Sequence, residues 1–168
     1  FRIYRLVFNL VAMVTVIPVM VYEQYPRGPM LFRWEGFLIL FQMILLISAI
    51  LLFLTGARHY DLLQFSGIRQ IKTGSSHNAL TETGELDTTG ILDITRHPWY
   101  LGAILIILTR DIDISALVTN IILTLYFILG TVLEERKLLI EYGADYRRYQ
   151  EKVSMLLPIK WLLSATRD

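Results

Sequence analysis

Two long segments without a charged residue constrain this chain more strongly than any other feature of its sequence. Gly36–Leu54 and Ile114–Leu133 contain no Asp, Glu, Lys or Arg. Each is close to the length of about 20 residues that a helix needs to cross the roughly 30 Å hydrocarbon core of a bilayer. Apolar residues make up 54% of the 168 residues, which is high for a water-soluble domain. These patterns predict an integral membrane protein.

Two shorter segments complete a predicted all-α bundle of about four spans. Leu6–Tyr22 predicts a first span, and Trp99–Thr109 follows Pro98, which is tolerated in the first turn of a helix. Because Trp99–Thr109 is short, we expect it to form a helical hairpin with Ile114–Leu133. The first residue is Phe1 rather than Met, which is compatible with a further segment upstream. The predicted single domain has two N-terminal spans in 1–54, a cytoplasmic loop in 55–97, the helical hairpin in 98–133 and a cytoplasmic C-terminal region in 134–168.

Basic residues gather on one predicted side of the membrane. By the positive-inside tendency this side faces the cytoplasm, which predicts a cytoplasmic membrane protein with both chain ends inside. The net charge of +1 provides no basic face for nucleic acid, and the absence of cysteine excludes disulfides, thiolate metal sites and a cysteine nucleophile. The basic residues on the predicted cytoplasmic side are Arg2, Arg5, Arg58, Arg69, Lys72, Arg96, Arg136, Lys137, Arg147, Arg148 and Lys152.

Two polar clusters lie at predicted membrane borders on this same side. Arg96–Gly102 (RHPWYLG) lies where the long loop re-enters the membrane, and Glu134–Arg136 (EER) follows the last apolar segment directly. A simpler explanation is that the first cluster marks the interface and the second caps a hydrophobic helix in water. Together, however, the clusters carry cations and carboxylates, which suits a ligand with both charges. S-adenosylmethionine carries a carboxylate, an ammonium, a sulfonium and a ribose diol, and charge-assisted hydrogen bonds would hold it.

Helix lengths alone leave these two clusters at different depths. The stretch from His97 to Arg110 corresponds to about 20 Å of helix, whereas the stretch from Ile114 to Glu134 corresponds to about 30 Å. A tilt between the helices, an asymmetric tip, or folding of Gly84–Thr95 over the site would each bring the clusters together.

Several spaced motifs in the second half of the chain resemble a known family. Arg96–Gly102 and Glu134–Arg136 are followed by Gly143-x-x-Tyr146-x-x-Tyr149 and by Val153–Pro158. This order resembles the C-terminal signature of the isoprenylcysteine carboxyl methyltransferase superfamily, which is also similar to phospholipid methyltransferases. With Phe65–Gln70, the chain looks most like methanethiol S-methyltransferases and members of the type that regulates nitrite and nitric oxide reductases (NnrU-like).

The resemblance implies a membrane-embedded S-adenosylmethionine-dependent methyltransferase with a small thiol or a lipid-like molecule as methyl acceptor. His97 or Glu134 would act as base if the acceptor must lose a proton. Leu92 and Gly130 depart from the prenylcysteine enzymes, which carry a tyrosine and an arginine there, so a prenylcysteine acceptor is disfavoured. The cofactor-binding residues implied by the resemblance are Glu85, Leu86, Asp87, Arg96, His97, Pro98, Tyr100, Glu134 and Glu135.

Two alternatives compete with the enzyme hypothesis. His59 and Asp61 are close in sequence and would allow a metal or haem site, but no pair among His59, His77 and His97 has the i, i+4 spacing of helical ligands. A non-enzymatic NnrU-like membrane protein that supports assembly of redox or denitrification enzymes is the stronger alternative. It predicts that Glu134 can be replaced without loss of function.

Overall fold

The computed structural model describes residues 28–59 and 86–166 together with five positions near the N-terminus, namely Val7, Leu10, Val11, Val14 and Ile17. The predicted first span Leu6–Tyr22 and the candidate site residue Glu85 therefore lie largely or wholly outside the described residues. The elements in chain order are β1 (Met30–Phe32), α2 (Leu38–Gly56), the short 3-10 helix η1 (Gly90–Asp93), α5 (Pro98–Leu108), β2 (Ile112–Asp113), α6 (Ile114–Tyr142), α7 (Ala144–Lys152) and α8 (Ile159–Ala165).

Helix ends follow from single residues that the sequence makes visible. Pro98 occupies the first turn of α5, where its missing N–H costs no hydrogen bond. The carboxylate of Asp113 accepts a hydrogen bond of 2.7 Å from the backbone N–H of Ala116 and so caps the start of α6. The helix ends at Gly143, which has φ of 56°, a conformation that favours glycine. The predicted helix start at Pro98 is confirmed.

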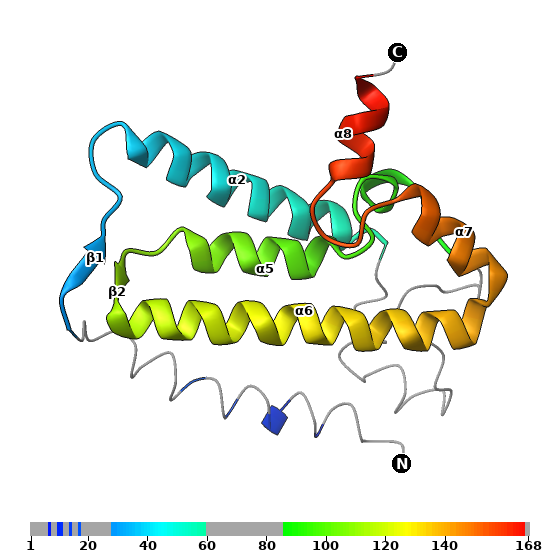
Figure 1. Ribbon diagram of the computed structural model, residues 1–168, viewed down its shortest axis with the longest axis horizontal. Helices are drawn as coiled ribbons and strands as arrows, with labels where there is room; N and C mark the ends of the chain where they lie inside the picture. Colours follow the sequence, from blue (N-terminus) through cyan, green and yellow to red (C-terminus); the bar gives the residue numbers. More distant parts are fainter. Residues whose placement is uncertain are drawn as a thin grey trace.

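Helices α2, α5 and α6 lie side by side in one layer, with α5 between the other two (Figure 1). At one end of the layer β1 and β2 pair as a small antiparallel sheet, and at the other end η1, α7 and α8 gather. The packing of α2 on α5 depends on small residues, because a Cβ at Gly102 would lie 3.0 Å from Phe53 and 3.3 Å from the carbonyl oxygen of Ala49. The Trp99 indole N–H also donates to the Phe53 carbonyl at 3.2 Å.

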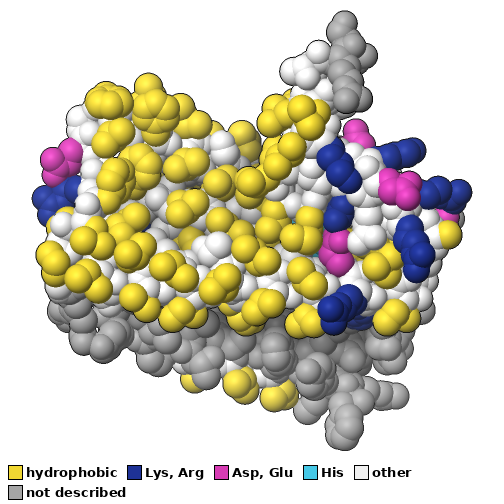
Figure 2. Space-filling view, in the orientation of Figure 1, with side chains coloured by type: hydrophobic (Ala, Val, Ile, Leu, Met, Phe, Trp, Pro, Cys, Tyr) yellow, Lys and Arg dark blue, Asp and Glu magenta, His cyan; other side chains and the backbone are white. Residues whose placement is uncertain are grey.

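Both long helices expose their apolar side chains instead of burying them. The apolar windows of α2 and α6 have mean hydropathies of 2.7 and 2.1, yet only 11% and 17% of each window is buried. A core helix of a soluble protein would be mostly buried, so these faces fit contact with lipid. Figure 2 shows hydrophobic side chains over the helical layer and charged ones gathered at its two ends.

The described structure is thus a mostly helical membrane protein with two helices long and apolar enough to span a bilayer. Helix α5 has 11 residues, about 16 Å of helix, which is too short to cross alone. The prediction of four spans with a C-terminal hairpin, and the predicted division of the domain, therefore stay predictions.

We expect the close approach of α2 and α5 to be sensitive to a larger side chain. Replacing Gly102 with valine should lower the free energy of unfolding by about 1 to 3 kcal/mol, because the new methyl groups meet Phe53 and the α2 backbone. Replacing the exposed Ala144 with valine is the matched control and should cost no more than about 1 kcal/mol. Thermal unfolding in detergent, followed by circular dichroism, measures both, and equal losses would contradict this packing.

Candidate functional site

The chain segment before α5 is held in place by the C-terminal stretch that follows α7. Thr95 and Ser154 form a parallel bridge, and the backbone N–H groups of Arg96 and His97 donate to the carbonyls of Ser154 and Met155 at 3.0 and 3.2 Å. The buried Thr95 hydroxyl adds a bond of 2.7 Å to the carbonyl of Leu156. These bonds give the Val153–Pro158 motif a structural purpose, since it fixes the backbone that carries Arg96 and His97.

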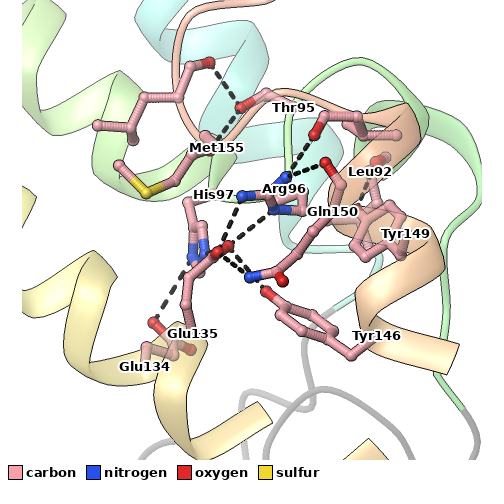
Figure 3. Close-up of polar contacts among 12 residues, drawn as sticks. Leu92, Thr95, Arg96, His97, Glu134, Glu135, Tyr146, Tyr149, Gln150 and Met155 are labelled. Carbon is pink, nitrogen blue, oxygen red and sulfur yellow. Dashed lines mark hydrogen bonds and ion pairs between the residues drawn. The ribbon is translucent and has the colours of Figure 1, made fainter. Parts of the chain in front are cut away.

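Glu135 of α6 is the centre of a buried polar cluster (Figure 3). Arg96 binds it with two parallel bonds, Nε to Oε1 at 2.7 Å and an Nη to Oε2 at 2.8 Å. His97 Nε2 lies 3.0 Å from Oε1, the Tyr146 hydroxyl donates to Oε1 at 2.9 Å, and the Gln150 amide donates to Oε2 at 2.5 Å. The side chain of Glu135 is only 10% exposed, so these bonds replace its lost hydration.

The remaining donors of this cluster are satisfied as well. Arg96 donates to the backbone carbonyls of Gln150 and Val153, which lie at the end of α7. Burial and then the negative charge of Glu135 raise the pKa of Tyr146, so its hydroxyl keeps its proton and remains a donor. The cluster therefore joins α6 and α7 to the segment before α5 as one rigid unit.

Glu134, the neighbour of Glu135 in sequence, has a different environment. Its side chain is 29% exposed, and its Oε2 lies 3.7 Å from Nδ1 of His97, beyond the reach of a hydrogen bond. The negative charge of Glu134 also interacts electrostatically with the nearby hydroxyl of Tyr100. Of the two carboxylates, Glu134 is the one with unused hydrogen-bonding capacity.

His97 and Tyr100 lie against each other near Glu134. Their rings meet edge to face with centroids 5.7 Å apart, and Tyr100 packs on Phe127 of α6 in the same manner at 6.1 Å. A Cβ on Gly130 would lie 3.3 Å from the Tyr100 ring, so the glycine gives that ring its place beside α6. Gly130, where the prenylcysteine enzymes carry an arginine, therefore allows a close contact between α5 and α6 in this chain.

The loop before η1 covers the other side of the cluster. Leu86, Asp87 and Leu92 line a small void together with Arg96, His97 and Tyr146. Asp87 accepts from the backbone and hydroxyl of Thr89 and lies 2.6 Å from Nδ1 of His59. Burial alone would raise the pKa of Asp87, but its bonds to His59 and Thr89 outweigh that effect and lower it.

The structure thus brings together most of the residues that the sequence singled out. Leu86 and Asp87 line the void beside the polar cluster, Tyr100 packs on His97, and Pro98 follows His97 at the start of α5. Glu85 lies outside the described residues. An asymmetric connection removes the expected difference in depth, because the chain turns at Thr109 and then runs on past the end of α5 through β2 before α6 begins (Figure 1).

Three residues that form polar contacts at this site were not predicted as such from the sequence. Gln150 carries no motif signal, and Tyr146 was noted only as part of a motif without a partner. His59 was weighed as a metal ligand with Asp61, which lies outside the described residues, whereas its partner in the structure is the distant Asp87. Within residues 28–59 and 86–166, no group of three His, Asp or Glu side chains is arranged to hold a metal ion.

An open groove adjoins this cluster where η1, the loop before it and α7 meet. It has a volume of about 710 Å³ and is lined on one side by Leu86, Thr88 and Asp93 and on the other by residues of α6 and α7, including Tyr142, Arg148 and Lys152. Burial raises the pKa of Tyr149, which also lines the groove and donates its hydroxyl to the Leu92 carbonyl. The groove provides room for a polar molecule at the charged end of the bundle.

We expect the two neighbouring carboxylates to differ sharply in their effect on stability. Glu135→Ala leaves Arg96 buried without a counter-charge, which typically costs about 3 to 5 kcal/mol and should lower Tm by roughly 6 to 20 °C. Glu134→Ala is the matched control, and because Glu134 is partly exposed it should change Tm by no more than a few degrees. Similar shifts for both variants in detergent would refute the structural role assigned to Glu135.

Comparison with known proteins gives partial sequence relatives. The chain is 38% identical over 76 residues to the methanethiol S-methyltransferase of Pseudomonas deceptionensis, a match that covers 45% of this chain and 29% of that protein. It is 29% identical over 116 residues to the methanethiol S-methyltransferase of Crocosphaera subtropica, covering 68% of this chain and 42% of that protein. A methanethiol S-methyltransferase of Bradyrhizobium diazoefficiens is 39% identical over 64 residues, covering 38% of this chain and 22% of that protein.

These matches span less than half the length of each relative. No family model matches the chain, and no solved structure matches it. By sequence, the chain is a relative of the methanethiol S-methyltransferases, as its motifs predicted.

Proposed function

We propose that this chain belongs to a membrane methyltransferase that transfers a methyl group from S-adenosylmethionine to a small thiol at the cytoplasmic face of the membrane. One observation carries the proposal: His97, with an unused buried nitrogen, faces the partly exposed carboxylate of Glu134 at the charged end of an otherwise apolar bundle. The names of the relatives, methanethiol S-methyltransferase, support methyl transfer to a thiol as the reaction of this site.

The donor set fits S-adenosylmethionine by charge and by position. Glu134 offers a carboxylate with free acceptor capacity to the ammonium or sulfonium of the methyl donor. The adjoining groove, at about 710 Å³, lies within the size range of cofactor pockets and carries Lys152 for an anionic group, whereas Arg148 is ion-paired with Asp145. When bound, S-adenosylmethionine would supply the activated methyl group, and the loop at Leu86 and Asp87 would cover it.

The chain's own contribution to such a reaction is positioning and the exclusion of water. The Arg96–Glu135 pair holds the backbone at His97 rigidly, and the Tyr100 ring packs between α5 and α6 below it. Holding two reactants in line for displacement can lower the barrier by about 7 to 11 kcal/mol, and no covalent intermediate with the protein is needed.

The acceptor class follows from the relatives and the surroundings of the site. A small thiol is apolar and dissolves in the bilayer, so it can approach along the exposed apolar faces of α2 and α6, while the polar methyl donor enters from water. The names of the relatives favour a thiol over the lipid-like acceptor that the sequence left open. They give no support to the NnrU-like assembly role.

Binding of S-adenosylmethionine to the detergent-purified chain, measured by calorimetry, tests the cofactor assignment. We expect Glu134→Ala to weaken binding about tenfold or more, since a hydrogen bond to a charged group contributes about 1.5 to 3 kcal/mol. Glu141→Ala removes an exposed carboxylate from the same helix and should bind like the native chain. No binding to a folded native protein would sink this proposal and favour the assembly role.

Transfer of a labelled methyl group tests the acceptor. Protein in lipid nanodiscs should methylate a short alkanethiol and leave phosphatidylethanolamine in the same nanodiscs unlabelled. Methylation of the lipid instead would show that the acceptor is a lipid-like molecule rather than a thiol, and it would leave the cofactor assignment intact.

A further inference from the structure

One nitrogen of His97 is buried without a hydrogen-bond partner. The side chain is 2% exposed, and Nδ1 makes no hydrogen bond within the described part of the chain. A buried polar atom left without a partner costs about 1 to 3 kcal/mol, so such atoms are rare and tend to have a function. The structure keeps this unsatisfied nitrogen beside a cluster whose arginine, glutamate and tyrosine are all bonded.

Glu135 determines which nitrogen of His97 carries the proton. Its two oxygens receive the fork of Arg96, so the carboxylate is ionised and acts only as an acceptor. The bond between Glu135 Oε1 and His97 Nε2, 3.0 Å long, therefore requires the hydrogen on Nε2. In the neutral imidazole Nδ1 then has no hydrogen and presents a lone pair.

That lone pair faces a second acceptor. The Nδ1 atom and Glu134 Oε2 are 3.7 Å apart, and without a proton between them the two groups repel. A proton arriving on Nδ1 turns the repulsion into an ion pair, so the imidazolium would be flanked by Glu134 on one side and Glu135 on the other. A base oriented by a buried carboxylate is the arrangement that activates nucleophiles in hydrolases.

The neighbouring groups leave His97 as the base of choice. Arg96 always carries its proton, the Tyr146 hydroxyl donates to Glu135, and Glu135 itself is saturated with donors. Glu134 has free capacity, but an ordinary carboxylate is a much weaker base than an ordinary imidazole.

We propose that Nδ1 of His97 is the general base that removes the thiol proton, and that Glu135 is the positioning residue that keeps Nδ1 free for it; this rests on the proposed function. The S–H bond breaks, its proton moves to Nδ1, and its electron pair stays on the thiol sulfur. That sulfur forms the new bond to the methyl carbon. At the same time the bond between the methyl carbon and the sulfur of the methyl donor breaks, and its electron pair stays on the donor sulfur. The proton stays on Nδ1 beside Glu134 until it leaves to water.

A series of thiols with different acidity tests the catalytic half of this inference. His97→Gln keeps an N–H that can donate to Glu135 but has no base at the position of Nδ1. We expect kcat with an alkanethiol, which is mostly protonated at neutral pH, to fall about 10²-fold or more. With an aryl thiol that is already ionised, kcat should fall only a few-fold, because no proton has to be removed.

The outcomes separate this inference from the proposed function. If His97→Gln binds S-adenosylmethionine and loses the same factor with both thiols, His97 is no base, although the methyltransferase stands. If the native chain methylates no thiol, the proposed function and the base both fail. Should His97→Gln not fold, Glu134→Ala serves as the second variant: without its flanking carboxylate the alkanethiol reaction should slow more than the aryl thiol reaction, and equal slowing would overturn the inference.

Nitrogen NMR of the histidine rings tests the positioning half without any catalysis. The chain has only three histidines, so His59→Gln and His77→Gln identify the signals of His97 in ¹⁵N-histidine-labelled protein. We expect neutral His97 to carry its proton on Nε2 in the native chain and in Glu134→Ala. In Glu135→Ala, read below its lowered Tm, both tautomers should be populated. A proton on Nδ1 of the neutral native ring would overturn the inference.

Discussion

The buried ion pair between Arg96 and Glu135 is the interaction on which the rest of the site depends. Its partners are far apart in sequence, and it links the segment before α5 to α6. Two charges removed from water usually gain little net stability, because desolvation offsets their attraction. Here the remaining lone pairs and donors are filled by Tyr146, Gln150 and two backbone carbonyls, so the pair fixes geometry without leaving a charge unpaired.

This fixed geometry separates two adjacent glutamates into different tasks. Successive residues of an α-helix point about 100° apart, so Glu135 faces the buried cluster while Glu134 faces the His97 ring from the rim. Because the same helix carries both, a rotation that freed Glu135 would also move Glu134 away from His97. The structural role of Glu135 and the proposed chemical role of Glu134 therefore depend on the same turn of α6, which carries both residues in the EER motif.

The sequence predicts local features of this fold well and distant pairings poorly. Pro98 marks a helix start through its own backbone chemistry, and the uncharged runs mark the apolar helices, so those predictions hold. The partners of Glu135 come from separate segments of the chain, and no spacing rule reveals them. Likewise, the connection between α5 and α6 that brings His97 level with Glu134 includes β2, whose position depends on its pairing with β1, a strand much earlier in the chain.

The placement of the cluster at the end of the apolar layer has a physical reason. A carboxylate and a guanidinium in the middle of a bilayer would need to be paired and shielded from lipid. At the edge of the bilayer, the Arg96–Glu135 pair can be buried away from water while Glu134 stays partly exposed to it. A methyl transfer between a charged donor and an apolar thiol needs such a border, because each reactant is concentrated in a different solvent. The Tyr100 ring and the exposed apolar faces of α6 then lie on the lipid side of Glu134, and the groove beside α7 lies on the water side. The two reactants of the proposed reaction would therefore meet at His97 from opposite directions, with neither having to cross the solvent of the other.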